Sequence, residues 1–271
     1  MSDGKQMDYE EESTEQQQNQ PAQRQVPQDE GSDFPIKEGA VTGAIAVIAT
    51  YLTHLFLTAI VTAQVRPEAE SVGVGDDATL VITEMVSSWK AAGWSYLSVF
   101  GTGFEAEGET AFLSDAPNHG AAFAGSLGNA FTLSTLFLFI VTVGGIVTAG
   151  YAVAKYTDAD DAVDAAKAGV TVAVPYLAFA AIAAVVMTHT FSEVPTVVDL
   201  IGSEAVGVYG LESTEYLNDA GDQVVSDVEF GPSTTDAILF AGIIVPAILG
   251  AVGGVLTQRR DAFETVMAKV Q

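Results

Sequence analysis

The sequence contains no cysteine and very few basic residues, and these two absences narrow the classes of function. Without cysteine there is no disulfide, no thiol nucleophile and no cysteine-based metal site. Only 10 Lys and Arg residues stand against 35 Asp and Glu residues, which gives a formal net charge of −25. A balance this acidic repels phosphates, so we expect no nucleic-acid partner.

Recognisable catalytic and metal-binding motifs are also missing. The chain has no His-Glu-x-x-His pair, no phosphate-binding glycine loop and no Ser-centred nucleophile elbow. His119 and His189 are far apart in sequence, which is weak evidence for a metal site. The segment 189–236 is rich in carboxylates but lacks an Asp-x-Asp-x-Asp-Gly calcium loop. We therefore expect no enzyme activity, no cofactor and no metal site.

What the sequence does contain is four long stretches without a charged residue. They cover Val41–Val65, about Phe131–Val153, about Gly169–Thr188, and Ala237–Leu256. A bilayer core of about 30 Å requires roughly 20 such residues in an α-helix. Four runs of this length in one small soluble domain would leave too little chain to cover them. We therefore predict an all-α integral membrane protein with four transmembrane helices.

The rest of the chain divides around these helices. Residues 1–34 are polar, acidic and low in complexity, which predicts a disordered tail. The transmembrane domain then covers 35–256, with long loops at 66–128 and 189–236, before a C-terminal segment at 257–271. Eight basic residues lie before the first charge-free stretch, in the short connector between spans two and three, and in the C-terminal segment, and two lie in the long loops. Since basic residues mark the cytoplasmic side, we expect both termini in the cytoplasm and both long loops outside.

The excess of acids indicates a salt-rich environment. Carboxylates crowded on a surface repel one another, and a Debye length of roughly 3 Å at 1 M salt screens that repulsion. Together with the scarcity of lysine, this favours a halophilic source. An acidic membrane protein from an ordinary organism is the alternative.

A segment of the first long loop has helical periodicity. Apolar residues recur over 82–100 with helical spacing, while Glu84 and Lys90 fall among the polar positions. Its aromatic residues are of the types that anchor at a membrane–water boundary: Trp89, Trp94 and Tyr96. We predict an amphipathic interfacial helix, or a lid packed on the outer ends of the bundle. The alternative is a fifth span, which the two charges make costly.

The first span carries a polar stripe. Thr50, His54, Thr58 and Thr62 recur every four residues and therefore share one helix face. Turned toward the bundle interior, the stripe could line a path in which His54 takes a proton. The competing interpretation is that the threonines bond to their own helix and His54 to a neighbouring span. No acid lies inside a span to relay a proton, which favours the second interpretation.

Small residues and prolines mark the later spans. Five glycines are predicted to permit close helix packing: Gly144, Gly145, Gly250, Gly253 and Gly254. Pro175 and Pro246 each remove a backbone donor and are predicted kink sites. Spans two and four also end alike, at 143–148 and 252–257. Two explanations of this similarity are open: a parallel repeat of two spans plus two spans, or a chance match.

Several short motifs occur in a fixed order. Phe34-Pro35 precedes Gly39-Ala40-Val41, Trp89-Lys90-x-x-Gly93-Trp94 and Tyr96 follow in the first loop, and a span ends in Gly150-Tyr151-Ala152-Val153. This order resembles an uncharacterised family of haloarchaeal multi-pass membrane proteins, over about 34–256. The resemblance implies a membrane location and a haloarchaeal source. It implies no activity and no functional residues.

These features predict a non-catalytic component of a halophilic archaeal cell envelope that acts through contacts of its outer loops or tail. Its expected partners are the lipid bilayer and another membrane protein or a second copy of itself. The alternative is a small transporter or channel subunit with a polar path near His54. A polar cavity reaching His54 would favour transport, and a dry bundle with His54 bonded to a neighbour would favour the contact role.

Overall fold

The structure, a computed structural model, describes residues 34–64, 69–72, 79–82, 85–106, 108–111, 129–191 and 228–258. Four helices in these ranges are long and apolar enough to cross a membrane: Ile36–Gln64, Leu133–Tyr156, Ala162–Val186 and Thr234–Gln258. The predicted all-α membrane protein with four transmembrane helices is confirmed in its four spans, and the described residues are mostly helical with a small sheet in addition. The predicted tail, apart from Phe34, parts of the first long loop, most of the second and most of the C-terminal segment lie outside the described residues.

The first two spans are continuous helices, whereas the third and fourth are divided. Span one is α1 (Ile36–Gln64) and span two is α4 (Asn129–Tyr156). Span three consists of α5 (Ala162–Val170) and α6 (Ala173–Val186). Span four runs through α9 (Thr234–Asp236), the π-helix η2 (Ala237–Ile244), α10 (Val245–Val255) and the 3₁₀ turn η3 (Leu256–Gln258).

Span three begins at Ala162, several residues before the predicted start at Gly169. The charge-free run ends where α5 carries Asp164 and Lys167, but these two side chains are paired at 2.9 Å near the surface. Asp161 caps α5 by accepting from the two N–H groups at 163 and 164. The helix therefore extends through a charged turn that a search for uncharged residues leaves out.

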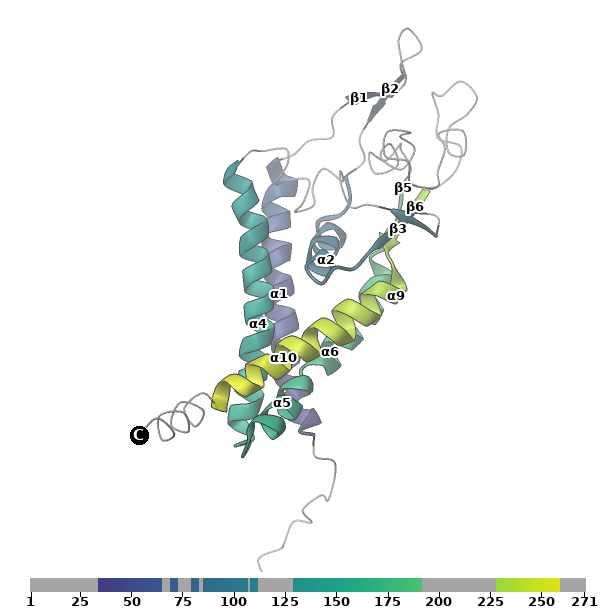
Figure 1. Cartoon of the computed structure of the whole chain (residues 1–271). Coiled ribbons are helices and arrows are strands. Elements are labelled where there is room, and N and C mark those ends of the chain that lie inside the picture. Colours follow the sequence, from purple (N-terminus) through teal and green to yellow (C-terminus); the bar gives the residue numbers. More distant parts are fainter. Residues whose placement is uncertain are drawn as a thin grey trace, which may run out of the picture. The chain divides into compact units, whose positions relative to one another are not determined.

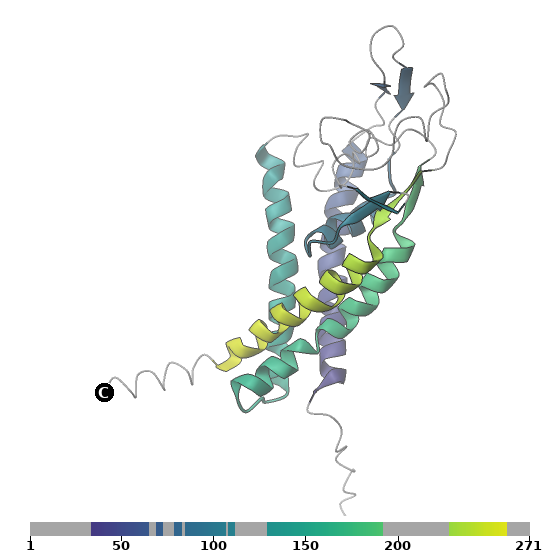
Figure 2. The same cartoon turned by 45° about the vertical axis from the view of Figure 1, so that its right-hand side comes forward.

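The helices have two ends, which we name by what they carry. The connector end holds the link between α4 and α5, and the loop end holds the long loops. α1 and α4 run side by side, while α10 and η2 cross them at an angle (Figures 1 and 2). α10 packs against α4 and α5 near the connector end, η2 packs mainly against α6, and α6 packs against α1. The core of the protein lies along these contacts.

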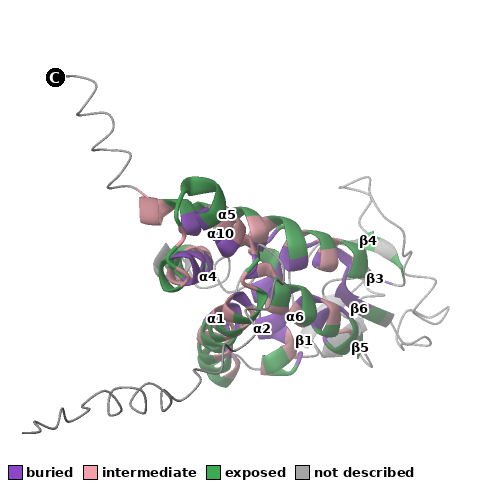
Figure 3. Cartoon of the chain, turned by 90° about the horizontal axis from the view of Figure 1, so that it is seen from below, coloured by how far each residue is buried: buried purple, intermediate pink, exposed green. Residues whose placement is uncertain are grey.

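The outward faces of the spans are apolar. Ile45 is 64% exposed, Phe56 is 66% exposed and Val185 is 70% exposed. Buried residues gather where the helices face one another (Figure 3). Exposing apolar surface to water costs a free energy of about 25 cal/mol per Å², whereas exposing it to lipid chains has no such cost. The burial pattern therefore fits a protein embedded in a membrane.

Short strands lie at the loop end, and the sequence analysis did not predict them. β1 (Ala69–Val72) pairs with β2 (Thr79–Ile82). β3 (Phe104–Ala106), β4 (Glu109–Ala111), β5 (His189–Phe191) and β6 (Val228–Pro232) form an antiparallel sheet in the order β4-β3-β6-β5. Strands of three to five residues are too short to show a period-two pattern. This sheet joins the two long loops beside α6 and α9.

The helix of the first long loop, α2 (Ser88–Ser98), is enclosed by protein. Trp94 and Tyr96 are 0% exposed, whereas Trp89 is 40% exposed. The boundary position expected for Trp94 and Tyr96 is therefore not what the structure shows. The reason is that the polar face of α2 also meets protein: Ser95 lies against His54 of α1, and Lys90 donates to the Thr188 carbonyl just beyond α6. At 11 residues, α2 is also far too short to form a fifth span.

Candidate functional site

Buried polar side chains from four helices meet inside the bundle. We call them the polar cluster: Thr50 and His54 of α1, Ser95 and Tyr96 of α2, Thr142 of α4, and Tyr176 of α6. Each is at most 7% exposed. Polar groups buried in this way are costly unless they bond to one another, so their partners decide what the cluster does.

His54 ties three helices together. Its Nδ1 lies 3.1 Å from Ser95 Oγ on α2, and its Nε2 lies 3.0 Å from Thr142 Oγ1 on α4. A neutral imidazole carries one donor and one acceptor, and a hydroxyl can take either role. Both ring nitrogens are thus satisfied without a charge. The arrangement makes His54 a structural bridge from α1 to both neighbours.

Thr50 forms the second link between α1 and α2. Its hydroxyl donates to the Ala46 carbonyl at 2.7 Å and lies 2.9 Å from the Tyr96 hydroxyl. Because the single Thr50 proton goes to Ala46, Tyr96 is the donor in the second bond. The Tyr96 ring packs edge-on against Tyr51, His54, Phe100 and Phe179, with centroids 5.1–6.0 Å apart. Burial raises the pKa of Tyr96 well above its ordinary value, so its hydroxyl stays protonated.

Tyr176 is the one member of the cluster whose polar atom lacks a partner within the described part of the chain. Its side chain is 1% exposed and its ring lies 6.1 Å from that of Phe100. Among the described residues no group meets its hydroxyl at hydrogen-bond distance and angle, although the Tyr96 and Thr50 hydroxyls lie nearby. A buried hydroxyl without a partner costs about 1–3 kcal/mol. Tyr176 is therefore the weak point of the cluster.

On its other side, α2 is bonded to the end of α6. Lys90 Nζ donates to the Thr188 carbonyl at 2.5 Å, and Trp94 Nε1 donates to the Met187 carbonyl at 2.9 Å. These two carbonyls follow directly after the last turn of α6, where backbone acceptors have no partner within the helix. A lysine there also meets the negative end of the helix dipole. α2 is thus fastened both to α1 and to α6.

The predicted polar stripe is only partly assembled into the cluster. Thr50, His54 and Thr58 are buried, whereas Thr62 is partly exposed near the loop end. Thr50 bonds to its own helix, and His54 bonds to side chains of α2 and α4. The sequence analysis missed Ser95, Thr142 and Tyr176, although each is a polar residue within an apolar segment. Isolated polar residues of this kind are candidate partners for a buried histidine, and Ser95 and Thr142 are the two that meet His54.

Four of the five predicted packing glycines lie against another helix. A β-carbon at Gly145 would lie 2.7 Å from Thr50 Cγ2. β-carbons at the other three would press on backbone carbonyl groups: Gly250 on Gly169, Gly253 on Val147, and Gly254 on Ala165. Gly144 differs, because no described residue of another element lies within 4 Å of its added β-carbon. It sits one residue away from Gly145 and so faces away from the partner helix.

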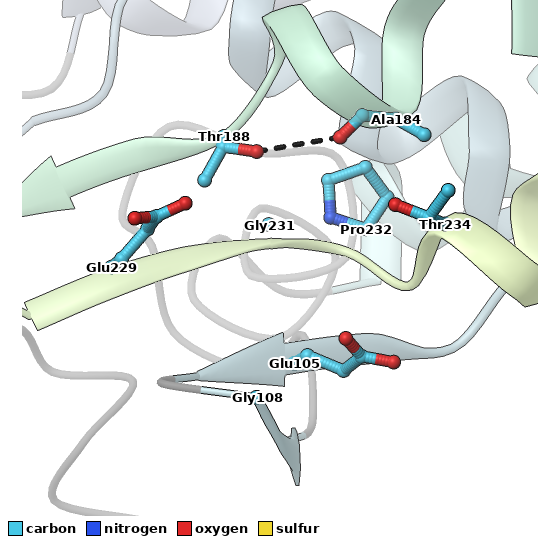
Figure 4. Close-up of a pocket in the computed structure, with 8 residues that line it drawn as sticks. All are labelled: Glu105, Gly108, Ala184, Thr188, Glu229, Gly231, Pro232 and Thr234. Carbon is cyan, nitrogen blue, oxygen red and sulfur yellow. Dashed lines mark hydrogen bonds between the residues drawn. The ribbon is translucent and has the colours of Figure 1, made fainter. Parts of the chain in front are cut away.

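A second polar feature lies at the loop end. A pocket of about 260 Å³ opens there between the sheet and the ends of α6 and α9, with Glu105 of β3 and Glu229 of β6 beside it (Figure 4). No residue of the polar cluster lines this pocket. Among the described residues, no three His, Asp or Glu side chains gather closely enough to hold a metal ion. The pocket and the polar cluster are therefore separate features.

The comparisons with known proteins place the chain in one family. A family model described as a family of unknown function, DUF7978, matches residues 15–261. The chain belongs to this family. No curated protein and no solved structure matches the chain. In this family member, every described helix and strand, and so the whole polar cluster, lies within the matched residues.

Proposed function

We propose that this family member is a non-catalytic, multi-pass component of a haloarchaeal cell envelope that works by contact. Both termini are cytoplasmic in this proposal, and the loop end faces outward. The orientation is supported by the distribution of basic residues, and the haloarchaeal source by the net charge of −25. Its partners are lipid and another membrane protein or a second copy of itself.

The observation that carries the contact role is the closure around His54. The imidazole is 0% exposed and both its nitrogens are bonded, to Ser95 at 3.1 Å and to Thr142 at 3.0 Å. The helix α2 covers this side chain from the loop end, and small residues bring the helices together at the connector end. A transported ion needs exchangeable ligands or water along its path. The bonded, enclosed histidine supplies a helix bridge instead.

The alternative function is a small transporter or channel subunit. Its support is the inward-facing polar stripe, since Thr50, His54 and Thr58 are all buried in the bundle. A measurement of flux in proteoliposomes separates the two functions. The purified chain is reconstituted at high salt, and the movement of H⁺, Na⁺, K⁺ and Cl⁻ is followed with ion-sensitive dyes.

The contact role predicts that wild type, His54→Ala and protein-free liposomes show the same background flux. The matched control is Thr53→Val, because among the described residues the Thr53 hydroxyl bonds to its own helix alone, at the Ala49 carbonyl. Flux above background that is present in wild type and Thr53→Val but lost in His54→Ala would establish transport and refute the contact role. A partner is then sought by co-purification in mild detergent at high salt, with an unrelated haloarchaeal membrane protein as the control bait.

A further inference from the structure

The third span is interrupted where α5 meets α6. The N–H groups of Thr171, Val172 and Val174 each donate to the carbonyl three residues earlier, at 3.2 Å. Pro175 follows, and it has no N–H to continue the ladder. The span therefore changes from α-helical to tighter 3₁₀ geometry for one turn.

The fourth span is interrupted in a different way. Its first half, η2, has π-helical geometry up to Ile244, and α10 begins at Val245 with Pro246 in its first turn. π-helical segments are rare and often accompany functional sites. The proline again removes a backbone donor. Both divided spans therefore change helix type next to a proline.

The two interruptions lie side by side. On the connector side of them, a β-carbon at Gly250 would lie 3.1 Å from the Gly169 carbonyl carbon. On the loop side, a β-carbon at Gly242 would lie 3.1 Å from Leu177 Cα. Spans three and four run in opposite directions, so the stretch between these contacts places Pro246 level with the turn between α5 and α6. Both spans are therefore interrupted at the same level.

At the same level, the face of α1 that contacts span three carries glycines in place of larger side chains. Gly39 and Gly43 lie one helical turn apart on α1 and contact the turn between α5 and α6. A β-carbon at Gly43 would lie 2.6 Å from both Pro175 Cγ and the Val172 carbonyl oxygen. No α1 side chain is therefore interposed where the third span is interrupted.

The segments on the two sides of this level are held differently. At the connector end, α10 lies backbone to backbone on α4 and α5 through Gly253 and Gly254. On the loop side, η2 packs mainly against α6. α2 is bonded to the end of α6, and β3 pairs with β6. We call α2, α6, η2, α9 and the four-stranded sheet the loop-end unit.

Three hydrogen bonds join α2 to α1, whereas among the described residues α6 of the loop-end unit meets α1 by packing alone, for example through Phe179 on Tyr51. They are His54 Nδ1···Ser95 Oγ at 3.1 Å, Tyr96 OH to Thr50 Oγ1 at 2.9 Å, and Tyr51 OH to the Trp89 carbonyl at 2.8 Å. All three lie on one side of the level of the paired interruptions, at α1 positions beyond Gly43 toward the loop end. Breaking them would leave only packing contacts, such as the Tyr51–Tyr96 ring pair, between α1 and α2, and it would leave the bonds of α2 to α6 intact.

We propose that the loop-end unit pivots as one body at the paired interruptions of spans three and four, and that the bonds from α1 to α2 latch it closed. Hinges of this kind absorb backbone changes at a few positions between segments that stay rigid. α6 has 14 residues and is therefore about 21 Å long. A rotation of about 15° moves its far end by about 5 Å. The pivot would change the surface that the loop end presents.

The test measures two distances by pulsed electron spin resonance in the full chain. Because the chain has no cysteine, each introduced cysteine is labelled alone. The loop-end pair is Leu136→Cys on α4 with Thr234→Cys on α9, both at exposed positions. The connector-end pair is Val41→Cys on α1 with Val255→Cys on α10, also exposed. Each pair is placed in wild type, in Thr50→Val, in Thr50→Val with His54→Ala, and in Thr53→Val.

The proposal predicts a second loop-end distance, shifted by about 5 Å, that is more populated in Thr50→Val and most populated in the double variant. Each lost hydrogen bond of this type shifts a two-state equilibrium about fivefold. The connector-end distance stays as in wild type, and Thr53→Val matches wild type in both pairs. Thr50→Val keeps the shape of the side chain, so it remains informative if the double variant misfolds. A loop-end distance unchanged in Thr50→Val, or a connector-end distance that shifts equally, overturns the hinge.

Discussion

The substitution Gly253→Ala tests how closely span four packs on span two. A β-carbon at this position would press on the Val147 carbonyl oxygen, and it would lie 2.9 Å from the carbonyl carbon and 3.0 Å from the Tyr151 nitrogen. These are backbone atoms, so no rotation of a side chain relieves the overlap. Ordinary contacts of this type are about 3.5 Å or longer, which requires α10 to move away by at least half an ångström. The same movement strains the contacts of Gly250 and Gly254 on α5.

The size of the effect follows from two opposing contributions. Forcing an extra methyl group into a packed interface costs about 1–3 kcal/mol, and rigid backbone neighbours place this site at the upper end. Replacing glycine by alanine inside a helix returns about 1 kcal/mol. We therefore expect Gly253→Ala to destabilise the protein by about 1–2 kcal/mol. Gly144→Ala is the matched control, because no other element of the described structure comes within 4 Å of its added β-carbon and only the helical gain applies.

The assay is equilibrium unfolding of the full chain in mixed micelles at high salt, followed by circular dichroism. Wild type, Gly253→Ala and Gly144→Ala are compared in the same detergent. The expected order of stability is Gly144→Ala at or above wild type, with Gly253→Ala clearly below. If Gly253→Ala is as stable as Gly144→Ala, the close approach of α10 to α4 is wrong.

Three further predictions concern the polar contacts. Tyr176→Phe is expected to leave the free energy of unfolding unchanged or to raise it, because the buried hydroxyl has no partner in the described part of the chain. Tyr96→Phe removes the hydrogen bond to Thr50 and is expected to lower the free energy of unfolding by about 1 kcal/mol. Lys90→Met removes the bond from Nζ to the carbonyl at the end of α6 and is expected to cost about 1 kcal/mol, read out by unfolding as above. Asp161→Asn removes the charge from the cap of α5. In wild type, hydrogen bonds from two backbone N–H groups lower the pKa of the Asp161 carboxyl group. The stabilisation that the charge gives is therefore present above the ordinary pKa of about 3.9, and it is lost as the pH falls through the lowered pKa.

Each of these predictions has a control and a contrary outcome. Equal losses in Tyr176→Phe and Tyr96→Phe would show that the Tyr176 hydroxyl is bonded after all. Lys90→Arg keeps a donor near the end of α6, so it should retain part of the stability that Lys90→Met loses. Asp160→Asn changes a neighbouring exposed carboxylate that does not cap α5. A Tm difference between Asp161→Asn and wild type that is as large at pH 2 as at pH 7 contradicts the capping argument.

The four spans were predictable because their signal is simple. A bilayer excludes charge over about 20 residues, and the sequence obeys this rule four times. Boundaries were less predictable where charged residues find partners, as Asp164 and Lys167 do at the start of span three. The absence of charged residues therefore locates the middle of a span but does not show at which residue the helix begins or ends.

The position of α2 was not predictable from its own pattern. An amphipathic stripe predicts one covered face and one wet face, yet α2 is covered on both because its polar residues reach His54 and the end of α6. Which polar residue meets which is a long-range property, with Ser95 and Thr142 lying 41 and 88 residues from His54. Periodicity shows that a face is polar, and only the fold shows what lies opposite it.

Glycine pairs show the same limit. Gly144 and Gly145 are equivalent as composition, but a helix turns by about 100° between them, so only one meets a partner. The structure assigns that role to Gly145, against Thr50. Similarly, the sequence predicts possible kinks at Pro175 and Pro246. That the two prolines lie at the same level depends on how spans three and four pack.

The most direct test of the account is the side of the membrane on which each end of the chain lies. An epitope tag is placed before residue 1 or after residue 271, and a single cysteine is placed at Thr234, and each is probed with impermeant reagents on intact and lysed cells. Four spans with a non-spanning α2 predict that both tags react only after lysis and that the cysteine reacts on intact cells. Tags found on opposite sides of the membrane would contradict the four-span bundle.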